Sequence, residues 1–424
     1  MPSEQENPLE ALKAAFHSDN APLVRQLLDA HPAFRTRLGD PVMAFDSPPI
    51  IHVRSRAMLD VLLDAGADIN ARSTWWAGSF GLLDAAPLEL AHYALQRGAT
   101  LTAHAAARLG LLDRLREMVG ADPSLVHARG GDGQTPLHFA SSIEIADFLL
   151  DHGADIDARD IDHESTPAQW MIKERHAVAR HLATRGCHTD ILMASALGDR
   201  ELILRHLAEN PASIGISVSA VYFPMRDPRA GGTIYTWTLG LNATPHSTAA
   251  RFGHPGIVAL LMEHSPQEIR LAEYAASGNE AAARALLAGS PDLIRHLTKR
   301  DHDRLVSAAV DNRTDVVRLM LELGWPADAR GQHGGTALHW ACFHGNAAMA
   351  GVLLQYHPPL EATDHDYHAT PLGWALHGSE NGWQARTGDY PATVEALLRA
   401  GAKPPAALRG TPGVQEVLKR HGVR

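Results

Sequence analysis

Thr135-Pro136-Leu137-His138 is a short phrase that returns in altered form farther along the chain. The four later copies are Ser-Thr-Pro-Ala-Gln-Trp at 165–170, Ala-Thr-Pro-His at 243–246, Gly-Thr-Ala-Leu-His-Trp-Ala at 335–341 and Ala-Thr-Pro-Leu-Gly-Trp-Ala at 369–375. Two similar helix endings accompany them, Leu-Leu-Asp-Ala-Gly-Ala-Asp-Ile-Asn at 62–70 and Leu-Leu-Asp-His-Gly-Ala-Asp-Ile-Asp at 149–157. Recurrence at a fixed period decides the architecture, because it means that the chain is built from copies of one structural unit.

Each copy has the residues that a pair of helices needs. Thr or Ser caps the first helix, Pro occupies the first turn, where its missing N–H costs nothing, and Leu and Ala follow at helical spacing. The second helix, such as residues 143–150, ends at a Gly that can adopt the left-handed conformation of a helix C-terminus. Twelve such helix ends run from Leu28 to Leu398, which gives about 34 residues per unit.

These phrases resemble the ankyrin repeat over residues 8–402. The resemblance implies an all-α repeat solenoid of about twelve helix pairs joined by short β-hairpins. It also implies a binding scaffold that uses its hairpin tips and inner helices, and a structural role for His138 and His339, which would bond to the backbone of the loops.

The domain organisation follows from the period. We expect residues 1–402 to form a single solenoid and residues 403–424 to form a C-terminal capping segment. Insertions near 72–83, 215–242 and 378–390 interrupt the period. In the second insertion, residues 216–241, two β-rich runs flank a Pro/Gly turn, a pattern that predicts one enlarged β-hairpin.

The composition of the 424 residues excludes several classes of protein. The net charge of −10 disfavours a general nucleic-acid binder. Cys187 and Cys342 are the only cysteines and lack metal-ligand spacing, which fits a reducing compartment. The N-terminus is acidic without an apolar signal region, and no apolar run is long enough for a membrane span. We therefore expect a cytoplasmic monomer that binds neither nucleic acid nor membrane.

Aromatic and His residues recur at equivalent places in the repeats. Four residues after the Thr stand Phe139, Trp170, Trp340 and Trp374. These rings either fill gaps between helix layers or anchor a ligand, since Trp and Tyr dominate binding hot spots. With the residues of the insertions and tips, the candidate binding residues are Trp75, Trp76, His163, Trp170, Tyr235, Trp237, His333, Trp340, His365, His368, Trp374, His377 and Trp383.

The His and Asp residues at the hairpin tips raise the question of a metal. Imidazole and carboxylate suit zinc, iron or nickel. His163 and His333 are separated by several repeats, and only His333, His365 and His368, from adjacent tips, are placed to meet. Polar tips rich in turn-forming Asp explain the same residues without an ion. We expect no bound metal and no cofactor.

Enzyme motifs are absent, since the chain has no phosphate loop, no dinucleotide fingerprint and no nucleophile elbow. The leading interpretation is an ankyrin-repeat protein that recognises a partner protein through its concave face and hairpin tips, rather than an enzyme. The alternative is an enzyme or small-molecule-binding protein that uses His and Asp for acid–base chemistry. Its pocket would form where Trp75, Trp76, Tyr235 and Trp237 fold over the concave groove.

Overall fold

The computed structural model describes residues 8–424, which form helices and loops with no β-strand in that range. The all-α repeat architecture is confirmed. The expected β-hairpins are not formed, and the loops that stand at their places before each Thr are called hairpin tips below. The described loops hold three isolated β-bridges, at Met43–Ser47, Arg72–Gly81 and Arg330–Thr336. A strand needs a ladder of several bonds, and each tip makes at most one bridge. No helix of residues 8–424 is long and apolar enough to cross a membrane.

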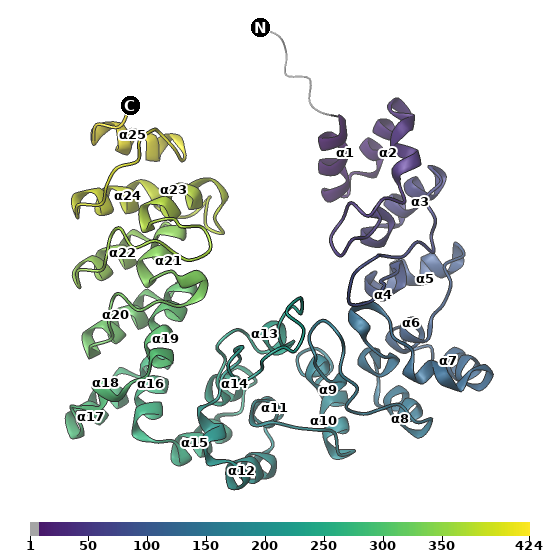
Figure 1. Cartoon of the computed structure of the whole chain (residues 1–424), viewed down its shortest axis with the longest axis horizontal. Coiled ribbons are helices and arrows are strands. Elements are labelled where there is room, and N and C mark those ends of the chain that lie inside the picture. The colour runs from purple at the N-terminus through teal and green to yellow at the C-terminus, as the bar shows by residue number, and fades with distance from the viewer. Residues whose placement is uncertain (1–7) are drawn as a thin grey trace. The chain divides into compact units, whose positions relative to one another are not determined.

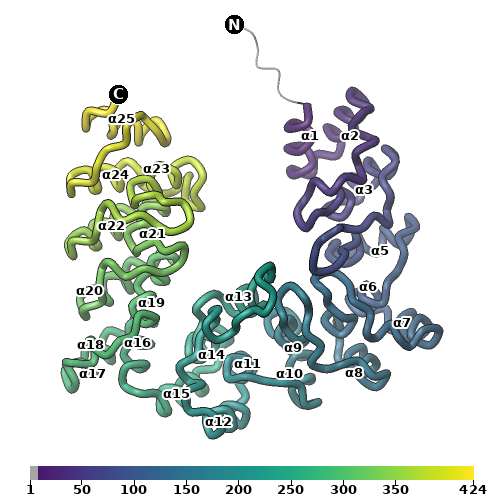
Figure 2. The backbone as a smooth tube through the Cα atoms, in the orientation of Figure 1, coloured from purple at the N-terminus to yellow at the C-terminus, as the bar shows by residue number. Residues whose placement is uncertain are grey.

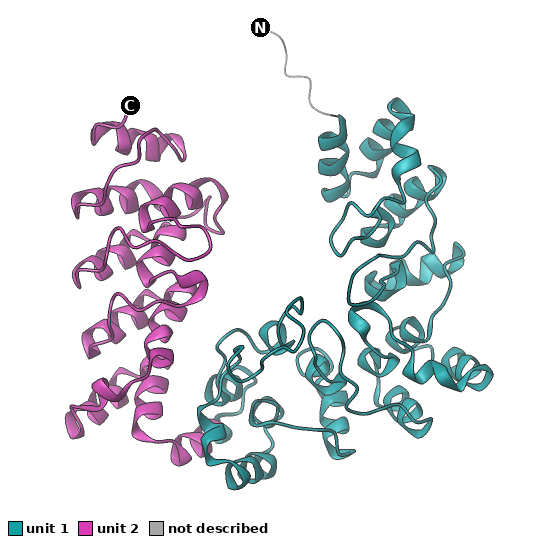
Figure 3. Ribbon diagram, in the orientation of Figure 1, with its two compact units in different colours: residues 1–257 teal, residues 258–424 magenta. Residues whose placement is uncertain are grey.

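The chain divides into two compact units, one ending at Ile257 and the other spanning Val258–Arg424 (Figure 3). The boundary lies inside α15 (Pro255–His264). Unit 1 contains two hydrophobic core clusters and unit 2 contains one. That residues 1–402 form a single solenoid stays a prediction, and residues 1–7 of that range lie outside the described residues.

Unit 1 is a series of short helices and 3-10 turns connected by long loops (Figures 1 and 2). Its α-helices are α1 (Pro8–His17), α2 (Ala21–Ala30), α3 (Arg56–Asp64), α4 (Leu82–Ala85), α5 (Leu88–Gln96), α6 (Ala103–Arg108), α7 (Leu112–Ala121), α8 (Ile143–Asp151), α9 (Pro167–Met171), α10 (His176–Thr184), α11 (Ile191–Leu197), α12 (Arg200–Glu209), α13 (Tyr235–Thr238) and α14 (Pro245–Arg251). Its 3-10 helices are η1 (Pro32–Arg37), η2 (Pro49–His52), η3 (Pro123–His127), η4 (Gly131–Gly133), η5 (Pro136–Phe139) and η6 (Pro211–Gly215).

Unit 2 shows the repeat more regularly, in two layers of helices (Figure 1). Its elements are α16 (Gln267–Ser277), α17 (Glu280–Gly289), α18 (Leu293–His296), α19 (Lys299–Val310), α20 (Thr314–Leu323), η7 (Gln332–Gly334), α21 (Ala337–Phe343), α22 (Ala347–Leu354), α23 (Pro371–Asn381), α24 (Tyr390–Arg399) and α25 (Pro412–Arg420). Helices α19, α21 and α23 pack in succession in one layer, and α20, α22, α24 and α25 do so in the other.

In two repeats, the histidine of the Thr-Pro-Leu-His phrase joins the repeat to the next one. His138 Nδ1 accepts a hydrogen bond from Thr135 N (3.0 Å), so its proton lies on Nε2, which donates to Ser165 O in the following repeat (3.2 Å). His339 makes the same two contacts, with Thr336 N (3.0 Å) and Ala369 O (3.2 Å). Both rings are buried and therefore neutral. The expected backbone-bonding role of these histidines is thus what the structure shows.

The insertion at residues 216–241 corrects the sequence analysis, because it is not an enlarged β-hairpin. Its two arms do not pair with each other. Val218 instead pairs with the chain leaving the insertion, accepting from Asn242 N (2.9 Å) and donating to Ala243 O (3.0 Å). On the other arm, Gly231 N donates to Asp162 O in a hairpin tip (2.9 Å). Since these neighbours satisfy the backbone groups, no ladder forms, and the second run becomes the helical turn α13.

The C-terminal segment packs on the last full repeat of unit 2. Helix α25 contacts α24 and buries Val414, Val417 and Leu418. We predict that deleting residues 403–424 lowers solubility and melting temperature, because the apolar face of α24 becomes exposed. Leu418→Ala should cost about 2–5 kcal/mol of unfolding free energy, whereas Lys419→Ala on the exposed face should change it by less than about 0.5 kcal/mol. Denaturant titration measures both, and equal effects would contradict the capping role.

The buried histidines predict a specific loss of stability in acid. Burial lowers the pKa of His138 to about 3 and that of His339 to about 4. In the unfolded chain a histidine titrates near ~6.5. The unfolded state therefore binds more protons between these values, and stability falls as the pH drops below about 6.5. Each ring should account for about 2 kcal/mol of unfolding free energy lost between pH 7 and pH 5.

The variant His138→Gln isolates this contribution. Gln169 occupies the equivalent position in the next repeat, where its Oε1 accepts from Thr166 N (2.9 Å), so glutamine fits the local hydrogen bonding. Urea unfolding at pH 7 and pH 5 should show a smaller acid loss in the variant than in the unmodified chain. An unchanged difference between the two pH values would mean that His138 is protonated in the folded protein.

Candidate functional site

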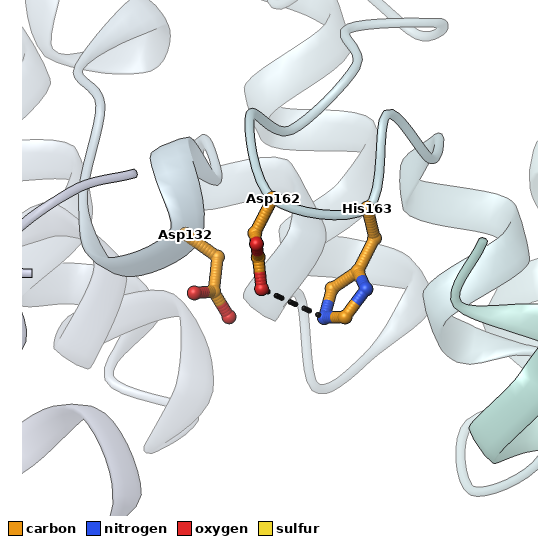
Figure 4. A group of neighbouring side chains, drawn as sticks. All are labelled: Asp132, Asp162 and His163. Carbon is orange, nitrogen blue, oxygen red and sulfur yellow. Dashed lines mark ion pairs between the residues drawn. The ribbon is translucent and has the colours of Figure 1, made fainter. Parts of the chain in front are cut away.

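Three side chains from two hairpin tips of unit 1 converge, and we call Asp132, Asp162 and His163 the tip cluster (Figure 4). One ligand atom from each lies within 4.8 Å of the others. The residues are 7%, 6% and 8% exposed, respectively. This is the one group of three or more His, Cys, Asp or Glu side chains with such spacing in residues 8–424.

Local structure positions each member of the tip cluster. Asp132 stands in η4 with a left-handed backbone, φ +54°. Its carbonyl accepts from Ile161 N of the next tip (2.7 Å), which holds the two tips together. The second tip is shaped by Asp160, whose Oδ1 accepts from His163 N (3.2 Å) and Ser165 N (2.8 Å). The first tip is therefore fixed by a backbone bond and the second by the Asp160 side chain, and neither depends on the side chains of the tip cluster.

The first and second insertions cover the tip cluster. Trp75 Nε1–H donates to Asp132 Oδ1 (3.1 Å). From the other insertion, Gly231 N donates to Asp162 Oδ1 (3.1 Å), and the carbonyl of Gly232 lies 2.7 Å from His163 Nδ1. A Cβ added at Gly231 would lie 3.2 Å from both Asp162 Oδ2 and His163 Cε1, so glycine permits this close approach.

The electrostatics of these tips are dominated by burial. The pKa of Asp132 is raised to about 6, mainly by burial and in part by the neighbouring Asp162 carboxylate, although His163 and the hydrogen bond from Trp75 oppose the shift. Burial also raises the pKa of Asp160 to about 6, although its hydrogen bonds from Ser165 N and from Trp170 Nε1 (2.8 Å) oppose the shift. Unit 1 thus holds several carboxyl groups in a poorly solvated region.

A groove of about 470 Å³ lies next to the tips of unit 1. Its lining includes Phe139 and Trp170 from the repeats and Ile234, Trp237 and Thr238 from the second insertion. Trp237 is 63% exposed. The ring of Trp170 meets the tip-cluster His163 edge to face at 5.2 Å between centroids. One side of the groove is therefore built by the insertion and the other by the repeats.

The aromatic residues of the insertions have different surroundings, although the sequence analysis grouped them. Trp75 and Trp76 contact each other at 6.1 Å between centroids, and the guanidinium of Arg229 lies 4.3 Å from the Trp76 ring. Tyr235 is buried in the core, where its OH donates to Asp190 Oδ2 (2.9 Å). Of these candidates only Trp237 lines the groove.

In unit 2 the candidate rings form a packed cluster. Trp340 and Trp374 are buried and meet at 5.1 Å between centroids, and Trp383, 66% exposed, lies 5.7 Å from Trp340. Trp374 Nε1 donates to Asp364 Oδ2 (2.8 Å), as Trp170 does to Asp160 in unit 1. In the repeat of Trp340, the position equivalent to Asp160 and Asp364 is occupied by Arg330, which cannot accept a hydrogen bond. Trp340 Nε1 accordingly has no hydrogen-bond partner within residues 8–424.

The histidines of unit 2 that the sequence analysis considered as the one possible metal group do not come together. His333 Nδ1 pairs with Asp366 Oδ2 at 2.6 Å, and only the backbone N of His365 reaches His333, donating to its carbonyl at 2.8 Å. His368 and His377 are exposed. The described residues contain no three-ligand group made of His333, His365 and His368.

Sequence reasoning missed Asp132, although a signal was present. Asp132 stands three residues before Thr135, the position that His163 and His333 occupy in their own repeats. Comparing equivalent positions in the repeats identified His163 and His333 as candidates, but it did not reveal the contact between Asp132 and Asp162. That contact joins the third residue before Thr in one repeat to the fourth residue before Thr in the next.

Comparisons with known proteins agree with this architecture. A family model described as ankyrin repeats (3 copies) matches residues 103–193, and one described as ankyrin repeats (many copies) matches residues 305–354. The first of these segments carries the tip cluster.

Curated relatives each match less than a third of the chain. Two are named probable E3 ubiquitin-protein ligases XBOS33 and XBOS32, both from Oryza sativa subsp. japonica. They are 35% identical over 109 residues and 32% identical over 123 residues, covering 26% and 28% of this chain. A third, the serine/threonine-protein kinase VIK of Arabidopsis thaliana, is 47% identical over 49 residues, 11% of each chain. The matches span only 21% and 25% of the two ligases.

The repeating helix pairs, the shared hydrogen bonds of His138 and His339 and the two family matches lead to one assignment. The chain contains ankyrin repeats, matched at residues 103–193 and 305–354, and repeats of this kind generally mediate protein–protein interaction.

Proposed function

We propose that the groove of unit 1 binds a segment of a partner protein, which places an apolar side chain against Trp170 and Trp237 and a carboxylate near Lys173. The observation that carries this proposal is the 63% exposure of Trp237 at the edge of a groove of about 470 Å³. A cavity of ~300–1,000 Å³ is the size that holds a ligand or a side-chain anchor. Exposed Trp is also the residue type most enriched in binding hot spots.

The charge of the groove favours an acidic segment. The whole chain carries a net charge of −10, yet the groove lining holds Arg108, Lys173 and Arg175 against the single acid Glu174. Arg108 and Arg175 donate to backbone carbonyls, which leaves Lys173 as the exposed cation. A partner carboxylate would therefore meet a local positive field on an otherwise acidic protein, which increases both specificity and association rate.

The same groove gives a second candidate function, the binding of a small organic ligand with or without catalysis. Ile234, Trp237 and Thr238 of the insertion form part of its wall, which a flat protein-binding face would not require. The rest of the aromatic lid expected for that alternative lies elsewhere, since Tyr235 is in the core and Trp75 contacts Asp132. Partner binding uses the groove as it stands, and we therefore favour it.

Peptide selection tests the proposal, because it does not require that the partner be identified first. Peptides selected from a random phage-displayed library against the full chain should be enriched in an aromatic or aliphatic residue next to Asp or Glu. Trp237→Ala should weaken their binding by about 2 kcal/mol, or roughly 30-fold. Because Trp237 is exposed, the melting temperature of this variant should hardly change. Isothermal titration calorimetry and thermal unfolding measure the two effects.

Trp383→Ala is the matched control, because Trp383 is 66% exposed but lies in unit 2. It should leave peptide affinity unchanged, while Lys173→Glu should reduce the affinity of the acidic peptides. If Trp383→Ala weakened binding and Trp237→Ala did not, the recognition surface would be the aromatic cluster of unit 2. Failure to select any peptide, together with saturable binding of a small compound that Trp237→Ala abolishes, would favour the second candidate.

A further inference from the structure

Successive hairpin tips meet at the same two positions in both units. In unit 2, His333, three residues before its Thr, faces Asp366, four residues before the next Thr, and His365 N donates to His333 O (2.8 Å). In unit 1 the equivalent positions hold Asp132 and Asp162, and Ile161 N makes the corresponding bond to Asp132 O (2.7 Å). The backbone arrangement is shared, so the side chains at these positions can be compared directly.

The unit 2 pair satisfies itself, whereas the unit 1 pair does not. His333 Nδ1 and Asp366 Oδ2 lie 2.6 Å apart as donor and acceptor. In unit 1 two carboxylates face each other, and both residues are more than nine-tenths buried. Asp132 Oδ1 accepts from Trp75 Nε1, but no donor in the described chain reaches Asp132 Oδ2. Two buried like charges without a compensating cation are strongly unfavourable.

His163 does not supply that compensation in its neutral form. Its Nδ1 lies 2.7 Å from Gly232 O, and a carbonyl oxygen can only accept, so the ring proton lies on Nδ1. Nε2 then carries a lone pair, and this atom faces Asp162 Oδ2 at 3.5 Å, as Figure 4 shows. With His163 neutral, three electron-pair donors therefore converge, the two carboxylates and His163 Nε2.

We propose that the tip cluster is a binding site for one transition-metal dication such as Zn²⁺, held by carboxylate oxygens of Asp132 and Asp162 and by His163 Nε2. The ligand atoms lie within 4.8 Å of one another, comparable to the roughly 3–4.4 Å between ligands of an ion with bonds of ~2.0–2.2 Å. One imidazole with two carboxylates is a donor set for such ions, and water completes the coordination.

The hydrogen bonds around the cluster match those of a metal site. A metal-bound histidine generally donates its other ring N–H to a carbonyl or carboxylate, which orients the ring. His163 does so to Gly232 O, and Asp162 Oδ1 accepts from Gly231 N. The ion would neutralise the two carboxylates and hold the second insertion to the tips. None of the three ligands lines the groove proposed for partner binding, although the groove's Trp170 contacts His163. The site concerns the folding of the insertion rather than recognition of the partner.

The experiment uses the full, untagged chain after removal of metals with EDTA. Zn²⁺ and, separately, Mn²⁺ are titrated by calorimetry, and bound metal is counted by mass spectrometry after dialysis. We expect one tight equivalent per chain and a higher melting temperature with the metal. Asp162→Asn and His163→Gln should each weaken that equivalent by at least about tenfold. Asp366→Asn, the matched control in unit 2, should leave it unchanged.

A second variant keeps the test valid if the others fold poorly. Asp132→Asn removes one of the two facing carboxylates and adds no stronger ligand, so it should fold without metal and show a smaller rise in melting temperature than the unmodified chain when metal is added. Asp162→Asn should also make the metal-free chain more stable than the unmodified metal-free chain, because it removes one of two facing charges.

Three outcomes would overturn the proposal. The first is an unmodified chain that retains no stoichiometric metal. The second is metal binding that Asp162→Asn and Asp366→Asn reduce equally, which would assign it to the many other histidines. The third is a metal-free cluster in which nuclear magnetic resonance shows both nitrogens of His163 protonated at neutral pH with added Zn²⁺ present, since an imidazolium would then be the cation that compensates the two carboxylates.

Discussion

Each repeat of this protein is completed by the next, and the buried histidine of the Thr-Pro-Leu-His phrase makes that dependence explicit. His138 uses one nitrogen to cap its own helix and the other to donate to Ser165 O in the following repeat. His339 does the same toward Ala369 O. A buried donor left without its acceptor costs about 1–3 kcal/mol. A repeat without its neighbour would therefore lose a bond as well as apolar contacts, which couples adjacent repeats.

The second connection between repeats lies at the hairpin tips, and there the two units differ in chemistry. A tip residue with a left-handed backbone, Asp132 or His333, accepts a backbone bond from the following tip. That bond brings its side chain against an aspartate, Asp162 or Asp366. With a histidine the pair is a half-exposed hydrogen bond. With an aspartate it is a buried pair of like charges. One substitution at a repeated position thus changes a structural contact into a candidate ion site.

The second insertion shows how a loop whose described secondary structure is one short helix, α13, can be ordered by its contacts. Its backbone bonds go to the tips and to the chain that leaves it, including Gly231 N to Asp162 and Ile234 N to Ser165 Oγ (3.1 Å). Glu164 Oε1 also accepts from Arg226 N (2.7 Å). These contacts hold Trp237 at the edge of the groove. A groove wall made by an insertion can change in sequence without disturbing the repeats behind it, which suits a recognition surface.

The sequence alone determined what depends on contacts within one period. Thr caps, helical spacing and left-handed Gly predict the helix pairs, and the buried role of His138 follows from the repeat phrase. Only the tertiary structure decided what depends on the stacking of repeats. The sequence of residues 216–241 is β-rich, but a strand requires a neighbouring strand to pair with. The hairpin tips make only single backbone hydrogen bonds to this segment, so no β-ladder forms. Tyr235 and Trp237 are two residues apart, yet one is buried and the other exposed, because a helical turn points them in different directions. The position of His163 in its hairpin tip made it a candidate site residue. Asp132 could not be grouped with His163 from the sequence, because the spacing of residues within one repeat does not show which residues of two neighbouring repeats touch.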